Sequence, residues 1–123
     1  MTLKHLFTFD FSNNTLPAQM VSSIVRMIAK YQEIEILCFN HVEMNDEICR
    51  LIFHGMTNSN LIFLNLSWNL LSENALECLV HILSVNRNLE KLALQHNNLG
   101  KGNLTSFANA ISEHQSLKYI DIS

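Results

Sequence analysis

One pattern of leucines recurs along this chain at an almost constant interval. The segment LIFLNLSWNLL, Leu61 to Leu71, returns as LEKLALQHNNL at Leu89 to Leu99 and as LFTFDFSNNTL at Leu6 to Leu16. A degenerate copy, IEILCFNHVEM, begins at Ile34, and a truncated copy, LKYIDIS, begins at Leu117. The starting positions differ by 34 − 6 = 28, 61 − 34 = 27, 89 − 61 = 28 and 117 − 89 = 28 residues. This regularity indicates a repeat protein, because chance clustering of apolar residues would not produce it.

Between the leucine-rich segments, the apolar spacing changes from every second residue to the three- and four-residue spacing of a helix. The stripe is clearest at Leu76, Leu79, Val80 and Leu83. It recurs at Leu104, Phe107, Ala108 and Ile111, at Val21, Ile24, Val25 and Ile28, and in weaker form at Ile48, Leu51, Ile52 and Gly55. Each repeat is therefore predicted to be a strand followed by a helix.

The single interval of 27 residues has a local cause in the second repeat. The distance along the chain from Met44 to Ile48 is one residue shorter than that from Leu71 to Leu76. We therefore place a one-residue deletion in the loop between strand and helix, because surface loops tolerate changes of length.

The segments fit the pattern L-x-x-L-x-L-x-x-N-x-L followed by a helix, which at about 28 residues resembles a leucine-rich repeat of the ribonuclease-inhibitor-like subfamily. The resemblance implies an α/β solenoid, a right-handed βα superhelix in a horseshoe arc, with a parallel sheet on the concave face and helices on the convex face. Residues 1–123 would form a single domain of four strand-helix repeats and a final strand, with repeats starting near 6, 34, 61, 89 and 117. Stacked repeats share one continuous core, because neither element can bury its apolar face alone.

The ninth position of the repeat carries Asn14, Asn69 and Asn97. An asparagine there can bond backbone groups that would otherwise be buried without partners where the chain leaves the strand. Val42 occupies this position in the second copy and cannot make those bonds. We therefore expect the series of asparagine bonds to be interrupted at Val42 and the turn there to be irregular.

Residues between the core leucines should point to the concave face and form rows, with about 4.8 Å between neighbouring strands. The third-position row is Thr8, Ile36, Phe63, Lys91 and Tyr119. The fifth-position row is Asp10, Cys38, Asn65, Ala93 and Asp121, and the eighth-position row, at the turn, is Asn13, His41, Trp68 and His96.

These rows predict a partner-binding patch centred on the only tryptophan of the chain. Exposed aromatic side chains are typical anchors of protein interfaces, because they supply a large contact area at a low cost in rotamer entropy. The candidate binding residues are Trp68, Phe63, Ile36, Lys91, His41, His96, Tyr119 and Asn65. The alternative is that Trp68 folds against its own repeat and covers the edge of the core.

Composition argues against several classes of protein. A net charge of −3 without a basic cluster argues against nucleic acid as a partner. No apolar run approaches the ~18 residues of a membrane span, and the N-terminus does not resemble a signal peptide. Three cysteines at unrelated spacings indicate free thiols in a reducing compartment. We therefore expect a cytoplasmic protein, or one in the host cytosol if it is a secreted bacterial effector, with no membrane partner.

Metal binding and catalysis are also not expected. His41 and His96 lie two strands apart, roughly 10 Å, which is too far to share one ion. The six histidines are therefore interpreted as ordinary surface residues. We find no phosphate-binding loop, no close carboxylate pair, and no nucleophile placed with a base and an orienting acid, so we expect neither an enzyme nor a cofactor.

Three functions remain open. The favoured one is an interaction module that binds a partner protein on its concave face. The second is a structural segment of a longer leucine-rich-repeat array, such as a sensor, cytoskeletal or effector protein, whose binding surface lies elsewhere. A GTPase-activating accessory is the least favoured, because Arg26, Arg50 and Arg87 fall on helices or in a helix-to-strand turn. The terminal strands have no polar caps, which also predicts self-association through them.

Overall fold

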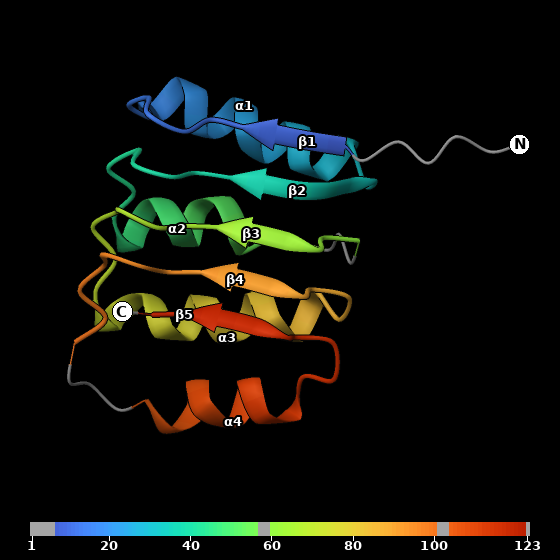
Figure 1. Cartoon of the computed structure of the whole chain (residues 1–123). Coiled ribbons are helices and arrows are strands. Elements are labelled where there is room, and N and C mark those ends of the chain that lie inside the picture. Colours follow the sequence, from blue (N-terminus) through green and yellow to red (C-terminus); the bar gives the residue numbers. More distant parts are fainter. Residues whose placement is uncertain (1–6, 57–59, 101–103, 123) are drawn as a thin grey trace, which may run out of the picture.

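The chain folds as one parallel sheet with helices on one side of it. The computed structural model describes residues 7–56, 60–100 and 104–122. In chain order the elements are β1 (Phe7–Asp10), α1 (Ala18–Lys30), β2 (Ile34–Cys38), α2 (Asp46–Phe53), β3 (Phe63–Asn65), the short 3-10 helix η1 (Glu73–Ala75), α3 (Leu76–Val85), β4 (Lys91–Ala93), α4 (Thr105–Glu113) and β5 (Tyr119–Asp121). The five strands lie in the order β1-β2-β3-β4-β5, and every neighbouring pair is parallel (Figure 1). The predicted α/β class is confirmed.

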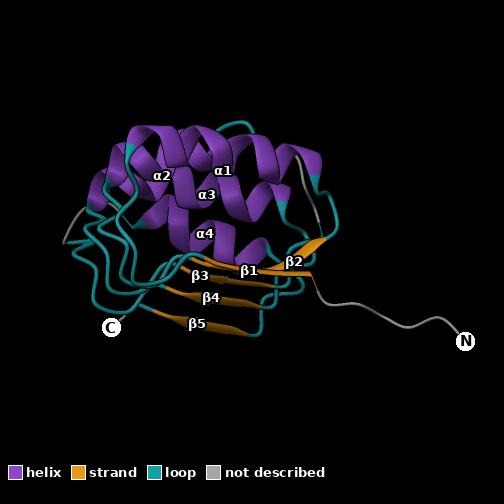
Figure 2. Cartoon of the chain, turned by 90° about the horizontal axis from the view of Figure 1, so that it is seen from above, coloured by secondary structure: helices purple, strands orange, loops and turns teal. Residues whose placement is uncertain are grey.

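The four α-helices form a second layer that covers one side of the sheet (Figure 2). We call the other side of the sheet the open face. Leu37, Leu64 and Leu92 lie opposite one another in the register of neighbouring strands, and all three side chains are fully buried beneath the helices. Strands β2, β3 and β4 therefore turn these leucines towards one core shared by the repeats, as the alternation predicts.

The apolar stripes predicted for the helices are buried in α1 and largely in α3, but the stripe predicted for α2 is wrong. Val21, Ile24 and Ile28 of α1 are buried as expected. In α2 the buried residues are Cys49, Ile52 and Phe53, whereas Leu51 is 52% exposed. The true stripe is therefore shifted by one residue from Ile48, Leu51, Ile52 and Gly55, and one residue is about 100° of rotation in a helix.

This shift moves the one-residue deletion to the other end of α2. Met44 to Cys49 spans 49 − 44 = 5 positions, and the equivalent buried pair Leu71 to Leu76 also spans 76 − 71 = 5. After the helix, Met56 to Leu61 spans 61 − 56 = 5 positions, whereas Leu83 to Leu89 spans 89 − 83 = 6. The second repeat therefore lost its residue between helix and strand, and the prediction that the loss falls between strand and helix is wrong.

Asn69 links the second and third repeats through their turns. Its Oδ1 accepts hydrogen bonds from the backbone N–H groups of Val42 (3.1 Å) and Met44 (2.9 Å), while its Nδ2 donates to the carbonyl of Phe39 (2.8 Å). Nδ2 also lies within hydrogen-bond distance of two carbonyls of its own repeat. Because Asn69 is buried, these bonds satisfy backbone groups that water cannot reach.

The same position behaves differently in the first two repeats. Asn14 is exposed and donates only to the carbonyls of Phe11 and Ser12, within its own repeat. Val42 is buried and has no side-chain group to reach back to the first repeat, so the series of asparagine bonds is interrupted there, as predicted. The turn is also irregular, because Glu43 adopts a left-handed φ of 58° in addition to His41.

Two buried polar residues, Asn86 and His114, end helices α3 and α4. His114 corrects the interpretation of all six histidines as surface residues. His114 is only 7% exposed, and it follows Asn86 by one period, 114 − 86 = 28. Its Nδ1 accepts from the backbone N–H groups of Ser116 and Leu117, so its Nε2 carries the proton donated to the carbonyl of Asn86 at 2.8 Å. His114 is therefore a structural residue rather than a surface histidine.

Candidate functional site

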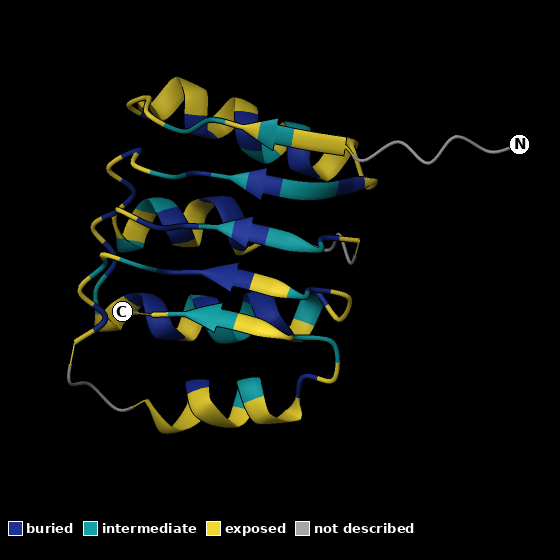
Figure 3. Cartoon of the chain, viewed as in Figure 1, coloured by how far each residue is buried: buried dark blue, intermediate teal, exposed yellow. Residues whose placement is uncertain are grey.

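The pairing of the strands brings the predicted rows together on the open face. Ile36 pairs with Phe63, Phe63 with Lys91, and Lys91 with Tyr119. Thr8 extends the same row onto β1. Figure 3 shows exposed segments at the starts of β4 and β5, where Lys91 and Tyr119 lie. The register therefore agrees with the third-position row.

Lys91 lies between two aromatic rings of this row. Its Nζ is 4.9 Å from the ring centroid of Phe63 on one side and 4.9 Å from that of Tyr119 on the other. An ammonium group over an aromatic ring is attracted by about 0.5–1 kcal/mol at an exposed site. The three side chains therefore form one cationic and aromatic strip across β3, β4 and β5.

Trp68 projects from the turn after β3 and is 52% exposed. Its backbone adopts a left-handed φ of 58°, and Asn13, His41 and His96 adopt the same conformation at the same position of their repeats. The Trp68 N–H still donates to the carbonyl of Gln95 at 2.8 Å, so the ladder between strands continues through the turn. About half of the Trp68 surface remains open, so this side chain is not a buried core residue.

The indole of Trp68 stacks on the imidazole of His96, with ring centroids 3.7 Å apart and an angle of 20° between the planes. A bulky residue in the left-handed region is uncommon and costs about 1–2 kcal/mol. The turn therefore holds a large exposed side chain in an unfavourable backbone conformation. Such strain is a reason to look for function at this position.

These side chains surround a shallow hollow of about 220 Å³ on the open face. The hollow is lined by Asn40, Phe63, Asn65, Ser67, Trp68, Lys91, Ala93, Gln95, Tyr119 and Asp121. Five of the eight predicted binding residues line it, namely Trp68, Phe63, Lys91, Tyr119 and Asn65. His96 adjoins it through Trp68, Ile36 borders Phe63, and His41 is exposed one strand away, at the end of β2.

The predicted binding residues include Asn65 but omit the rest of the polar floor of the hollow. Asn65 Oδ1 accepts from the backbone N–H of Ser67 (2.9 Å), and Ser67 Oγ accepts from that of Gln95 (3.2 Å). The Gln95 amide donates to the carboxylate of Asp121, which also lies 3.5 Å from the Tyr119 hydroxyl. Ser67 and Gln95 share the seventh position of the repeat, so this row was the signal that could have revealed the floor.

Two residues of the fifth-position row, both away from the hollow, have shifted pKa values. The hydroxyl and the backbone N–H of Ser12 stabilise the carboxylate of Asp10 and lower its pKa. Burial raises the pKa of Cys38, and the neighbouring negative charge of Asp10 raises it further. The open face at β1 and β2 therefore carries an anionic carboxylate beside a thiol that resists ionisation.

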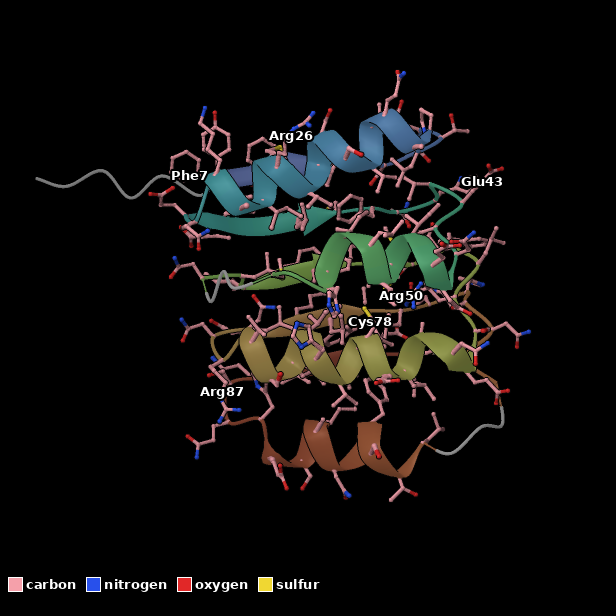
Figure 4. All side chains as sticks on the ribbon, turned by 180° about the vertical axis from the view of Figure 1, so that it is seen from behind. Phe7, Arg26, Glu43, Arg50, Cys78 and Arg87 are labelled. Carbon is pink, nitrogen blue, oxygen red and sulfur yellow. The ribbon has the colours of Figure 1, made fainter. Side chains whose placement is uncertain are left out.

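Other features of the molecule bear on the classes of protein that the sequence disfavours. Arg26 lies on α1, Arg50 on α2 and Arg87 after α3, all outside the rows of the open face (Figure 4). The longest helix in the part of the chain that the structure describes, α1, has 13 residues, so none of these helices could cross a membrane. Within residues 7–56, 60–100 and 104–122, no three His, Cys, Asp or Glu side chains gather to hold a metal ion.

Comparison with known proteins supports the fold alone. No family model matches the chain, and no curated protein matches it by sequence. Among solved structures, the chain is similar to one described as leiomodin-1 actin-binding site 2, with a TM-score of 0.72 and 16% sequence identity. The likeness covers 92% of this chain and 68% of that chain. At this identity it shows a shared arrangement of helices and strands.

Proposed function

We propose that this chain is a protein-interaction module of the leucine-rich-repeat type, and that a partner protein docks on the open face, the concave side of a solenoid. The repeat of about 28 residues and the resemblance of its pattern support the family. The strand order β1-β2-β3-β4-β5, with all helices on one side, is the arrangement that stacked strand-helix repeats adopt.

The observation that carries the proposal is the exposure of Trp68 at the rim of a hollow. Tryptophan is among the residues most enriched in interface hot spots, and such residues act as anchors in pockets surrounded by polar contacts. Trp68 is 52% exposed, and the hollow beside it combines the rings of Phe63 and Tyr119 with the charges of Lys91 and Asp121. A partner that covers this surface would bury aromatic area and also pair with a polar rim.

The solved structure with a similar fold is described as an actin-binding site. That protein therefore uses a chain of similar shape in binding another protein. Actin is the first purified partner to test here, although 16% identity does not carry residue contacts from one chain to the other.

A second candidate is a segment of a longer array whose binding surface lies on the helical side. A groove of about 630 Å³ lies between α1 and α2, and its apolar lining includes Val21, Val25, Ile48 and Leu51. Leu51 is 52% exposed, as is Trp68, so the helical side also presents apolar surface to a partner. The two candidates differ in which of these side chains the partner covers.

The deciding experiment compares Trp68→Ala with Leu51→Ala in affinity capture from an extract of the source cells, read by quantitative mass spectrometry. Each variant removes a side chain of equal fractional exposure, from opposite sides of the molecule. If the open face binds, Trp68→Ala loses a partner that Leu51→Ala retains. The reverse pattern would support the helical groove.

Once a partner is identified, the Kd values of the wild type and of Trp68→Ala measure how much Trp68 contributes to binding. Trp68→Ala should raise Kd by about 30-fold, which corresponds to about 2 kcal/mol. Because Trp68 is the only tryptophan, its fluorescence reports directly on the site. An unchanged emission spectrum on saturation with the partner, together with an unchanged Kd for the variant, would exclude Trp68 from the interface.

A further inference from the structure

Two cysteines from neighbouring repeats meet on the helical side of the molecule. Cys49 lies on α2 and Cys78 on α3, separated by 29 positions in the sequence. Their Sγ atoms are 3.5 Å apart, and both thiols are free. The Cys78 sulfur also lies 3.6 Å from the backbone carbonyl of Cys49. The contact is specific to this pair, because the third cysteine, Cys38, ends β2 on the open face.

Only one of the two thiols can be reached from solvent. Cys49 is completely buried, whereas Cys78 is half-buried and lines a hollow of about 640 Å³ between α2 and α3. The hollow is also lined by Asp46, Glu47, Arg50, His54, Asn74, Glu77 and His81. In Figure 4, Arg50 and Cys78 lie next to each other at the junction of the two helices. A small reagent would therefore meet Cys78 first.

The surroundings make the exposed thiol the more acidic of the two. The hydrogen bond with the Cys49 thiol lowers the pKa of Cys78, and the guanidinium of Arg50 acts in the same direction, against burial and Glu77. The same hydrogen bond raises the pKa of Cys49, and its burial adds to the effect. A partly exposed thiolate beside a cation is the usual environment of a reactive cysteine.

We infer that Cys49 and Cys78 form a redox-responsive pair, in which Cys78 reacts with a low-molecular-weight disulfide such as oxidised glutathione and Cys49 then closes a reversible disulfide between α2 and α3. The inference is independent of what binds the open face.

The two steps balance as ordinary thiol–disulfide exchange. The thiolate of Cys78 attacks one sulfur of the disulfide RSSR, which forms a Cys78–S–S–R bond and releases RS⁻. Cys49 then attacks the Cys78 sulfur, its proton passes to the departing RS⁻, and the Cys49–Cys78 bond replaces the mixed disulfide. Two protein thiols are oxidised and one RSSR is reduced to two RSH.

Closing the bond brings the two sulfur atoms closer together. The sulfur atoms must approach from 3.5 Å to the bond length of about 2.05 Å. The disulfide would connect two neighbouring repeats across 29 positions and restrict the unfolded chain. We expect the melting temperature of the oxidised chain to be higher by about 10 °C than that of the reduced chain.

The test incubates the reduced full chain in glutathione buffers of increasing oxidised fraction, followed by acid quenching, alkylation and peptide mass spectrometry. The expected product is a Cys49–Cys78 cross-linked peptide, preceded in time by a glutathione adduct on Cys78. Cys49→Ala should accumulate that adduct, and Cys78→Ser should leave Cys49 unmodified. Cys38→Ser is the matched control and should form the cross-link as the wild type does.

Three results would overturn the inference. The first is a glutathione adduct on Cys78 that persists in the folded wild type without a cross-link. The second is a cross-link that forms only when urea unfolds the chain, and the third is preferential modification of Cys38. Should Cys49→Ala fail to fold, the order of adduct and cross-link in the wild type decides the matter without it.

Discussion

The open face and the helix-covered face of the sheet are made from alternate residues of the same short strands, yet they differ in what holds them. On the covered face, Leu64 and Leu66 are fully buried in a core that continues from repeat to repeat. On the open face, Phe63 lies against the Lys91 ammonium and Trp68 stacks on His96. The difference indicates that the covered face determines stability, and it is consistent with the proposal that a partner binds the open face.

Truncating one side chain on each face tests most directly whether the two faces contribute differently to stability. Leu66→Ala should lower the free energy of unfolding by about 2–5 kcal/mol, because it opens a cavity beneath the helices. Trp68→Ala should cost less than about 1 kcal/mol, because the indole is 52% exposed. Urea denaturation of both variants measures the two values. Equal losses would show that Trp68 belongs to the core.

The turns offer a second, smaller contrast. Asn69→Ala should cost about 1–3 kcal/mol, because the backbone groups of Val42, Met44 and Phe39 lose a buried partner. Asn14→Ala, at the same position of the first repeat, should cost less than about 0.5 kcal/mol because its bonds are exposed and local. Thermal denaturation of both variants compares them, and identical melting temperatures would remove the role assigned to Asn69.

Thiols on the two faces should differ in how their reactivity depends on pH. Thiolate is the reacting form, so a cysteine loses reactivity as the pH falls through its pKa, which is about 8.5 for an ordinary thiol. Because the pKa of Cys78 is lowered and that of Cys38 is raised, the reactivity of Cys38 should begin to fall at a higher pH than that of Cys78.

Rates of alkylation of each residue, followed by mass spectrometry across the pH range, measure this difference. Cys49→Ala is the informative control, because it removes the hydrogen bond that stabilises the Cys78 thiolate. The pH profile of Cys78 should then move towards that of an ordinary thiol. Superimposable profiles for Cys38 and Cys78 in the wild type would contradict the assignment.

The smallest effect is expected within the strip of the open face itself. Lys91→Met removes the ammonium from between Phe63 and Tyr119 but keeps an apolar stem over the rings. The loss of stability should be below about 1 kcal/mol, the range of an exposed cation–π contact. A calorimetric melting curve tests this, and a loss comparable to that of Leu66→Ala would mean that the strip supports the fold.

The rows of the open face could be predicted because they follow from local periodicity. Alternation along a strand decides which residues share a face, and the 28-residue period brings equivalent residues of adjacent strands into register. Phe63, Lys91 and Tyr119 were therefore placed correctly without knowledge of any contact. Only the packing of the rings around Lys91 required coordinates.

One repeated pattern thus predicts the order of strands and helices and the rows of the open face, because it specifies each of them locally, whereas it left the exposure of Trp68 undecided. The tertiary structure alone decided the rotation of α2, the structural role of His114 and the meeting of Cys49 with Cys78. These three features depend on how neighbouring repeats pack against each other. The stripe of α2 was predicted one position out because the one-residue deletion lies after this helix rather than before it, and a shift of one position rotates a helix by about 100°, enough to bury Cys49 and expose Leu51.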